Sequence, residues 1–249
     1  MNDFLLGLVG FGVIFLSTVL MVGLVALRRK SSPVFREIAA FTRLRHAVGR
    51  VVEDGTRLHV SLGRGALATP QSASALAGLA LLRRLAELTS AGDQPPIATS
   101  GDAALAILSQ DTLQSGAQVS AQGAYDPAAG RLTGLTPFSY AAGALLVIRD
   151  ENISTNVLIG NFGVEAALLA EAAERANTFT LAASDNLTAQ AVLYASAQEP
   201  LLGEELYAAG AYVDSGRLHS ASLTVQDILR WLIIAVIVVG ALLKLIGIL

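Results

Sequence analysis

Small and polar residues that could bind a nucleotide follow the first predicted strand of this chain. Residues 57–62 alternate apolar and polar side chains, and the next six residues read Gly-Arg-Gly-Ala-Leu-Ala. This Gly-x-Gly-x-x-Ala pattern is similar to the dinucleotide fingerprint, in which glycines admit a pyrophosphate to a strand-to-helix turn. However, the next helix signal comes only at Pro70, and no acidic residue ends a strand about 20 residues later to hold a ribose. We therefore favour a turn that simply needs small residues.

Other polar residues follow predicted strands in the same way. Ser100-Gly101-Asp102 and Ser184-Asp185-Asn186 each lie between a predicted strand and a predicted helix. Open α/β sheets bind ligands at this edge, but Ser, Asp and Asn are also common helix caps, and we favour capping over catalysis. Any ligand site is expected to combine residues from several of these turns: Gly63, Arg64, Gly65, Ser100, Asp102, Asn161 and Ser184.

Most catalytic signatures are missing from the sequence. The absence of cysteine excludes disulfides, thiol catalysis and thiolate metal sites. His46, His59 and His219 have no ligand spacing, so we expect solvated or hydrogen-bonded surface histidines. Neither a nucleophile elbow nor a phosphate-binding loop is present. We predict no catalytic residue, no metal and no cofactor, and an enzyme is the less favoured class.

The elements that would position these residues alternate between strands and helices. Strands are predicted over 57–62, 96–100, 156–162 and 178–182. Helices are predicted from Thr69-Pro70 onward and over 103–113, 138–149, 164–176, 187–197 and 200–212. Residues 115–134 are expected to form a long excursion or a weak hairpin, and 144–148 could instead extend as a strand. The alternation predicts an α/β fold with a Rossmann-like, mostly parallel sheet between two terminal transmembrane helices.

Two apolar segments, 4–27 and 231–249, are expected to cross a membrane. A crossing helix needs roughly 20 apolar residues. Lys244 interrupts the second segment, but a lysine near a helix end can extend its ammonium to the headgroups, and Trp231 lies where an interface anchor is expected. The predicted divisions are 1–30 (first span and basic flank), 31–54 (juxtamembrane helix), 55–214 (α/β domain) and 215–249 (linker and second span).

Basic residues behind the first segment predict the orientation. Arg28, Arg29 and Lys30 follow it directly, and seven of the 17 lysines and arginines lie between residues 28 and 50. Positive charge favours the cytoplasmic side, so we expect a two-pass protein of the cell membrane with both termini outside and the α/β domain in the cytoplasm. A cleaved signal peptide is less favoured, because the apolar run is long and ends in Arg-Arg-Lys.

A predicted amphipathic helix follows this basic flank. Ser32-Pro33 is a helix-start signal, and apolar residues then recur at spacings of three and four: Val34, Ile38, Phe41, Leu44, Val48 and Val51. Arg36, Arg43 and Arg50 occupy the opposite side. The helix could lie in the membrane interface, pack on its own domain or pair with another copy.

The amino-acid composition and charge limit the classes of partner that the protein is expected to bind. The chain is 53% hydrophobic and 15% charged, as expected for a membrane protein carrying a globular domain. The basic residues concentrate near the membrane and leave the α/β domain acidic, which argues against nucleic acid as a partner. We expect the basic flank to face anionic lipid headgroups in the bilayer, and the protein to associate with copies of itself or with other membrane proteins.

Two stretches resemble a known family. Residues 59–84 (HVSLGRGALATPQSASALAGLALLRR) and 156–174 (NVLIGNFGVEAALLAEAAE) are similar to a prokaryotic family of membrane proteins described as a domain of unknown function. The resemblance implies membrane anchors at both ends and covers most of the chain. It implies no activity.

Two functions remain open from the sequence. The first is a membrane-anchored, non-enzymatic scaffold or assembly protein, homo-oligomeric, whose Ala- and Gly-rich helices permit close packing. The second is a nucleotide- or metabolite-sensing domain with its site at the carboxyl ends of the strands.

Overall fold

The computed structural model describes residues 2–27, 35–69, 72–119, 125–213 and 217–246. By their contacts the residues form two units. Glu37–Ser215 is the larger unit, and Met1–Arg36 with Gly216–Leu249 forms the smaller one. The larger unit holds the α/β domain and every candidate site residue outside the membrane-interface set.

Six parallel strands form the sheet of the larger unit. They are β1 (Arg57–Gly63), β2 (Ile97–Ser100), β3 (Gly130–Leu132), β4 (Ile153–Asn161), β5 (Phe179–Ser184) and β6 (Glu199–Leu201). Their order in the sheet is β3-β2-β1-β4-β5-β6, and every pairing is parallel. The predicted α/β fold with a parallel sheet is confirmed. The strand order is that of dinucleotide-binding folds, with its reversal point between β1 and β4.

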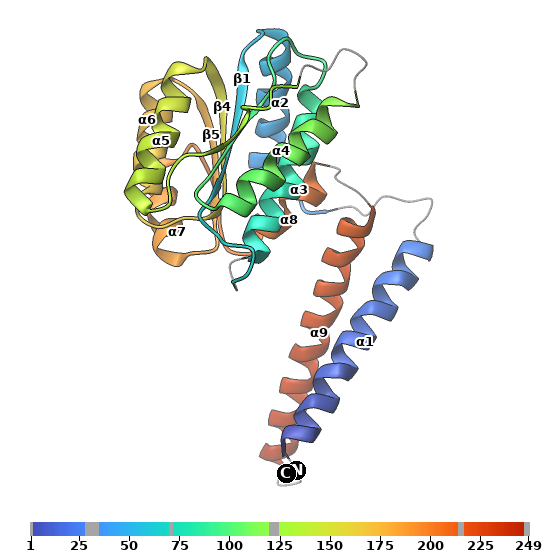
Figure 1. Cartoon of the computed structure of the whole chain (residues 1–249). Coiled ribbons are helices and arrows are strands. Elements are labelled where there is room, and N and C mark those ends of the chain that lie inside the picture. The colour runs from blue at the N-terminus through green and yellow to red at the C-terminus, as the bar shows by residue number, and fades with distance from the viewer. Residues whose placement is uncertain (1, 28–34, 70–71, 120–124, 214–216, 247–249) are drawn as a thin grey trace. The chain divides into compact units, whose positions relative to one another are not determined.

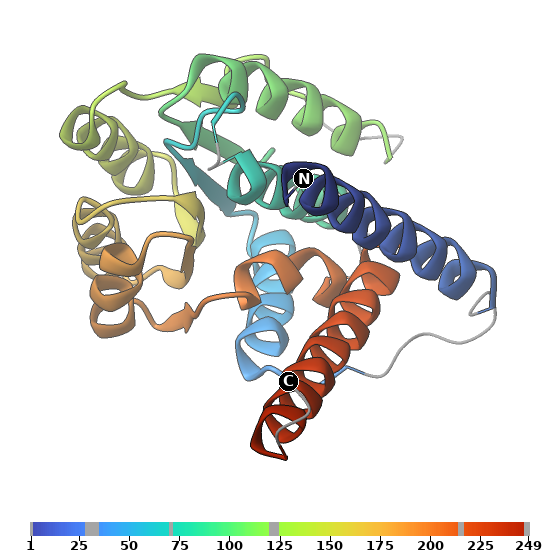
Figure 2. The ribbon, with the colours of Figure 1, turned by 90° about the horizontal axis from the view of Figure 1, so that it is seen from below.

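Helices cover both faces of this sheet (Figure 1). One face carries α2 (Ala39–Glu53), α3 (Ser72–Thr89), α4 (Ala103–Ala117) and α8 (Glu205–Tyr212). The other carries α5 (Pro137–Asp150), α6 (Ala166–Arg175) and α7 (Leu187–Ser196). Figure 2 shows the same layers from below. Each face has its own hydrophobic core, one around Leu58, Val60 and Leu62 of β1 and one around Tyr140 and Phe162.

Most predicted elements are present, and their ends follow local chemistry. The Thr136-Pro137 signal starts α5 with a capping box, in which the Thr136 hydroxyl accepts from the Ser139 N–H and Ser139 bonds back to the Thr136 N–H. Residues 144–148 belong to this helix and not to a strand. The Gly-rich excursion ends in β3, which pairs parallel to β2, so it is not a hairpin.

The predicted helix over 200–212 is wrong at its start. Residues Glu199–Leu201 instead form the edge strand β6, and α8 begins at Glu205. Pro200 fits there because an edge strand can leave one side without a backbone donor. Gly203, with φ +57°, then turns the chain into α8.

The amphipathic helix packs on its own domain. Phe41, Leu44, Val48 and Val51 of α2 are all at most 4% exposed and belong to the core on that face. Residues 35–38 are not helical, and the extended Ile38 packs against the core. The helix therefore begins at Ala39, later than predicted. The expected start at Ser32-Pro33 lies outside the described residues.

The smaller unit consists of α1 (Asn2–Leu27) and α9 (Arg217–Leu245). Within the described residues, one helix is long and apolar enough to cross a bilayer, His219–Leu245, and none of its most apolar window is buried. The described part of α1 offers a shorter apolar stretch, Gly10–Ala26. Phe11 and Phe15 on this stretch are 68% and 63% exposed. Helix α9 starts at Arg217, well before the predicted span at 231, so residues 217–230 are helical.

Candidate functional site

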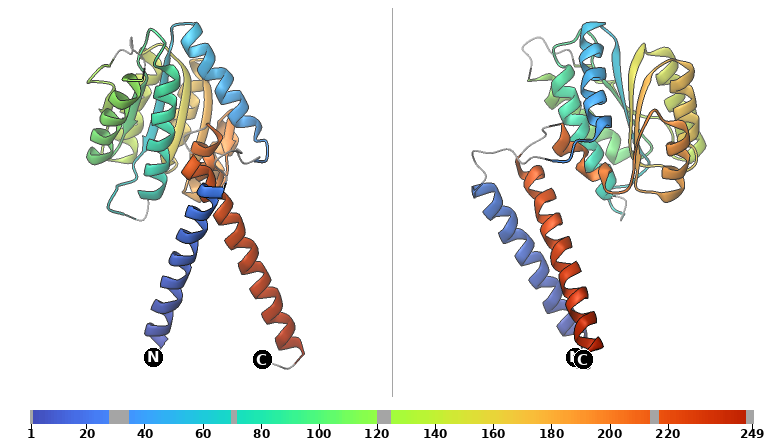
Figure 3. Two further views of the ribbon diagram at one scale, coloured as in Figure 1. Left: turned by 90° about the vertical axis from the view of Figure 1, so that its right-hand side faces the viewer. Right: turned by 180° about the vertical axis from the view of Figure 1, so that it is seen from behind.

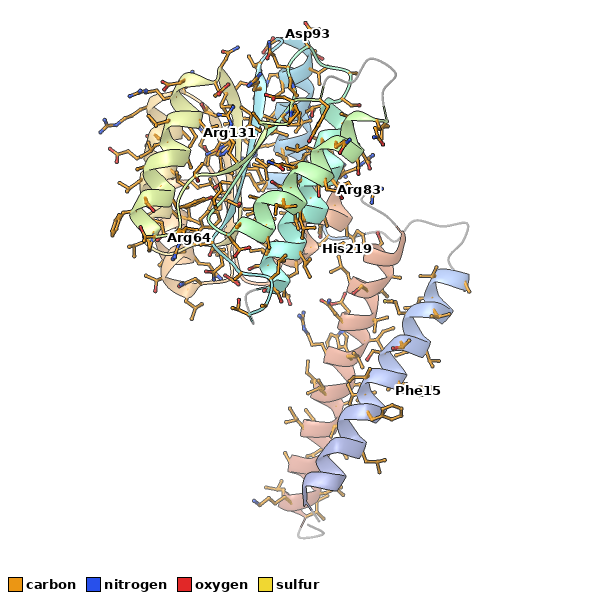
Figure 4. All side chains as sticks on the ribbon, viewed as in Figure 1. Phe15, Arg64, Arg83, Asp93, Arg131 and His219 are labelled. Atoms are coloured by element: carbon orange, nitrogen blue, oxygen red, sulfur yellow. The ribbon has the colours of Figure 1, made fainter. Side chains whose placement is uncertain are left out.

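The predicted site residues meet at the carboxyl edge of the sheet, around the reversal point between β1 and β4. Gly63 ends β1 and is paired in register with Asn161, which ends β4. The Arg64 N–H donates to the Asn161 carbonyl at 2.8 Å, and the Gly101 N–H after β2 donates to the Gly63 carbonyl at 2.8 Å. Figure 4 labels Arg64 at this end of the domain. Open α/β sheets bind ligands in a crevice at this point.

The strand ends leave no space between them here. Gly63 has φ +69°, and a Cβ added to it would lie 2.2 Å from the Asn161 carbonyl oxygen. Its N–H donates to the hydroxyl of Tyr140 at 3.2 Å, and the same hydroxyl bonds to Ser61. Tyr140 comes from α5 and is fully buried, which raises the pKa of its hydroxyl. The backbone donor that the fingerprint would offer to a phosphate is therefore used inside the protein.

A buried carboxylate lies beside this turn. Glu165 immediately precedes α6 and is 2% exposed. Its Oε1 accepts from the Gly163 N–H at 3.0 Å and from Nε of Arg64 at 3.1 Å. A backbone N–H beside an arginine guanidinium could bind an anion, and here the protein's own carboxylate accepts from both donors.

Asn161 and Ser184 are also engaged within the domain. The Asn161 amide donates to Oδ1 of Asp185 at 2.7 Å, and the Ser74 hydroxyl of α3 donates to Oδ2 at 2.7 Å. The Ser184 hydroxyl accepts from the Phe162 N–H at 3.2 Å and from the Asn186 N–H at 3.2 Å. These bonds tie the turns after β4 and β5 to each other and to α3.

The remaining predicted residues have structural roles. Asp102 caps α4 by accepting from the Leu105 N–H at 3.0 Å, and Ser100 donates its hydroxyl to the Asp102 carbonyl at 3.0 Å. Asn186 caps α7 through its bond from the Thr188 N–H at 2.9 Å. The capping interpretation therefore holds in both turns. Gly65 is buried in the loop after β1.

His59 is fully buried in the middle of the sheet, so the expectation of a surface histidine is wrong. Its Nδ1 lies 2.7 Å from Oδ1 of Asn156, and its Nε2 lies 2.9 Å from the Thr99 hydroxyl. Burial lowers its pKa from 6.5 to about 4, partly opposed by the hydrogen bond to Asn156 and assisted by the positive charge of Arg131. The imidazole is neutral near pH 7. The alternating pattern of β1 placed His59 correctly on the side opposite Leu58, but a sheet covered on both faces buries both sides.

Sequence reasoning missed three of the groups that complete this edge: Tyr140, Glu165 and the Ser74–Asp185 contact. All three come from helices or helix starts, where polar residues are ordinarily solvated or capping. No spacing rule connects them to β1. Ser61 gave the one available signal, because a polar residue on a doubly covered strand needs a buried partner.

Other parts of the predicted site lie elsewhere. Arg28, Arg29 and Lys30 are outside the described residues, and Trp231 is 70% exposed on α9. A surface hollow of about 240 Å³, lined in part by Glu174, Thr180 and Gln198, lies near the opposite end of β5. Among the residues the structure describes, no three His, Asp or Glu side chains are grouped to hold a metal ion.

A comparison with models of protein families identifies a match over nearly the whole chain. A family model described as a domain of unknown function, DUF6754, matches residues 5–249. The resemblance inferred from the stretches 59–84 and 156–174 is confirmed. The comparisons with curated proteins and with solved structures found no match.

Proposed function

The chain belongs to the DUF6754 family, whose description names no activity, and from its geometry we propose a membrane-anchored, non-enzymatic scaffold protein. In this proposal the α/β domain is held on the cytoplasmic face by two terminal spans, and the protein assembles with copies of itself.

The proposal rests on the carboxyl edge of the sheet, where the polar groups that could bind a ligand are already hydrogen-bonded within the domain. At the reversal point the Gly63 N–H, the Arg64 guanidinium and the Gly163 N–H before α6 all bond to groups of the domain itself. A nucleotide would have to displace a buried carboxylate and a buried tyrosine hydroxyl to reach them. Each displaced polar group would lose its hydrogen bonds, at about 1–3 kcal/mol apiece. This arrangement favours a rigid interaction module over an enzyme or a nucleotide sensor.

The larger unit also supports two anchors on one side. Chain residues near its two ends are adjacent, because Phe41 of α2 stacks on Tyr212 of α8 with ring centroids 4.7 Å apart. The segments leading to α1 and α9 therefore depart from neighbouring points on the domain. This supports a two-pass chain whose two spans enter the membrane from the same side. The positive charge of residues 28–30 favours the cytoplasm for that side, so that both termini would be outside the cell.

Exposed apolar side chains on the outer helices support self-association. On α7, Leu187 is 80% and Tyr194 is 66% exposed, and on α5, Phe138 is 64% and Leu146 is 54% exposed. Anchored copies share one plane and one orientation, which favours repeated side-by-side contacts between such surfaces.

Light scattering on the protein in mild detergent tests the assembly. We expect a defined mass above that of one chain, which falls for the double variant L187S/Y194S and stays unchanged for I107S, a change at a 65% exposed isoleucine of α4. A single-chain mass for the unmodified protein at all concentrations would contradict the proposal.

A membrane-tethered sensor of a nucleotide or metabolite remains the alternative prediction. A ligand that binds only the folded domain must raise its melting temperature. A panel of nucleotides and metabolites that raises it in the unmodified protein would favour the sensor over the scaffold.

A further inference from the structure

The surface hollow between α6 and α7 has no role in the scaffold proposed above. The two helices pack side by side on one face of the sheet (right-hand view of Figure 3). The hollow has a volume of about 240 Å³, and it is lined by residues of both helices, of β5 and of the turn before β6. Thr180, the second residue of β5, is among them, so the hollow lies at the opposite end of β5 from the carboxyl edge.

Alanine side chains leave this space open. Ala170 of α6, Ala195 of α7 and Ala197 just after α7 all line the hollow, and none of them extends beyond its Cβ. Thr180 lines it too and is only 2% exposed. A water molecule needs roughly 30 Å³, so the hollow has room for a short organic molecule.

The charge of the lining is negative. Glu174 of α6 lines the hollow, and its carboxylate has no ion-pair partner among the residues that the structure describes. Its neighbour Arg175 pairs instead with Glu171, one turn back on the same helix, at 2.6 Å. On the β6 side, Glu199 pairs with Arg43 of α2, which covers the other face of the sheet.

The C-terminal ends of both helices add to this negative charge. Helix α6 ends at Arg175 and α7 ends at Ser196, each within one residue of a residue that lines the hollow. The last carbonyls of a helix carry a partial negative charge. A carboxylate in the last turn is repelled by the dipole of its own helix, and a bound cation at Glu174 would relieve that repulsion.

The hydroxyl groups of the lining are free to accept hydrogen bonds. Ser196 donates its hydroxyl hydrogen to the Val192 carbonyl at 3.0 Å, and Thr180 donates its own to the Thr178 carbonyl at 3.3 Å. Each oxygen keeps lone pairs for a further donor. An ammonium group has three N–H donors and no acceptor, so it matches these oxygens and the Glu174 carboxylate.

We propose that the hollow binds a small protonated amine, with the ammonium at Glu174 and a short hydrocarbon stem against the alanines. The proposal depends neither on the scaffold function nor on the placement of the membrane helices. So small a ligand makes few contacts, and we expect a dissociation constant on the order of 1 mM and rapid release during purification.

Thermal unfolding of the full chain in mild detergent tests the site with butylammonium chloride. At about ten times the expected dissociation constant, the amine should raise the melting temperature by about 3–5 °C. Ammonium chloride carries the charge without the stem, and 1-butanol carries the stem without the charge. Neither should raise the melting temperature by a comparable amount at the same concentration.

Two variants with matched controls assign the effect to the hollow. E174Q removes the charge and A195L fills the space from an exposed position, so each should abolish the rise. D111N, at an exposed acid of α4, and A191L, at an exposed alanine of α7 outside the hollow, should retain it.

The outcomes separate this site from the carboxyl edge. A rise that E174Q and A195L both remove supports the hollow and leaves the choice between scaffold and nucleotide sensor unaffected. No response to butylammonium, an equal response to ammonium chloride or 1-butanol, or a rise that survives either variant would overturn the proposal.

Discussion

Phe41 and Tyr212 lie face to face, with their ring planes inclined by 13° and their centroids 4.7 Å apart. One belongs to the first helix of the α/β domain and the other to its last, so the stack joins the two ends of a sequence of some 170 residues. Arg45 reinforces the join through its bond to the Tyr212 carbonyl. The domain is thereby closed on itself where its connections to α1 and α9 begin.

Truncation of the first ring should destabilise the domain strongly. Phe41 is 2% exposed, and F41A should lower the free energy of unfolding by about 3–5 kcal/mol through lost burial and a residual cavity. Denaturant unfolding of the full chain in detergent measures this. F138A, at a 64% exposed phenylalanine of α5, is the control and should cost far less. Equal losses would mean that the stack does not stabilise the domain.

The tight turn after β1 can be tested with a pair of glycines. Gly63 and Gly203 both have positive φ, +69° and +57°, so a Cβ costs each about 1–2 kcal/mol of backbone strain. Only Gly63 has a neighbour in the way, the Asn161 carbonyl oxygen at 2.2 Å, whereas Gly203 faces open space. We expect G63A to destabilise the domain well beyond G203A. Similar melting temperatures for the two variants would show that the strand ends can separate.

Removal of the buried carboxylate should create an anion site. E165A leaves the Arg64 guanidinium and the Gly163 N–H without their shared acceptor, which should cost about 1–3 kcal/mol. Phosphate should then raise the melting temperature of E165A while leaving the unmodified protein unaffected, because only the variant has the position open. E171A, which removes an exposed partner of Arg175, is the matched control. Phosphate stabilisation of the unmodified protein would show that Glu165 does not occupy the position.

The lowered pKa of buried His59 should make the domain less stable in mild acid. Its pKa is about 4 in the folded protein and 6.5 when unfolded, so the unfolded chain binds the extra proton first as pH falls. Stability is fully present above pH 6.5 and declines as pH falls toward 4, by about 3 kcal/mol in all. Unfolding measured across this range should show a slope that H59Q flattens. H46Q changes an exposed histidine of α2 and should retain the slope.

Local sequence signals predicted where helices and strands begin better than they predicted which other elements these pack against. Thr136-Pro137 and Asp102 mark helix starts because the cap is formed by residues a few positions away. Pro200 was assigned to a helix because its place in an edge strand depends on β5, a partner outside its own segment. In the same way, the apolar stripe of α2 predicted a buried face but could not distinguish a protein core from a bilayer, since both accept the same side chains.

The sequence predicted where the candidate site lies but not that its polar groups are already bonded within the domain. Parallel strands bring their carboxyl ends to one edge, so Gly63, Asn161 and Ser184 had to lie near each other. Whether that edge is open depends on Tyr140 and Glu165, which bond to Gly63 and Arg64 from 77 and 101 positions farther along the chain. Such contacts leave no spacing pattern in the chain.

Native mass spectrometry of the protein released from its own membranes in mild detergent tests the scaffold most directly. The account predicts a defined homo-oligomer, with or without a protein partner, and no retained small molecule. A single chain that carries a nucleotide or metabolite mass would contradict it, and would mean that the carboxyl edge of the sheet opens to admit a ligand.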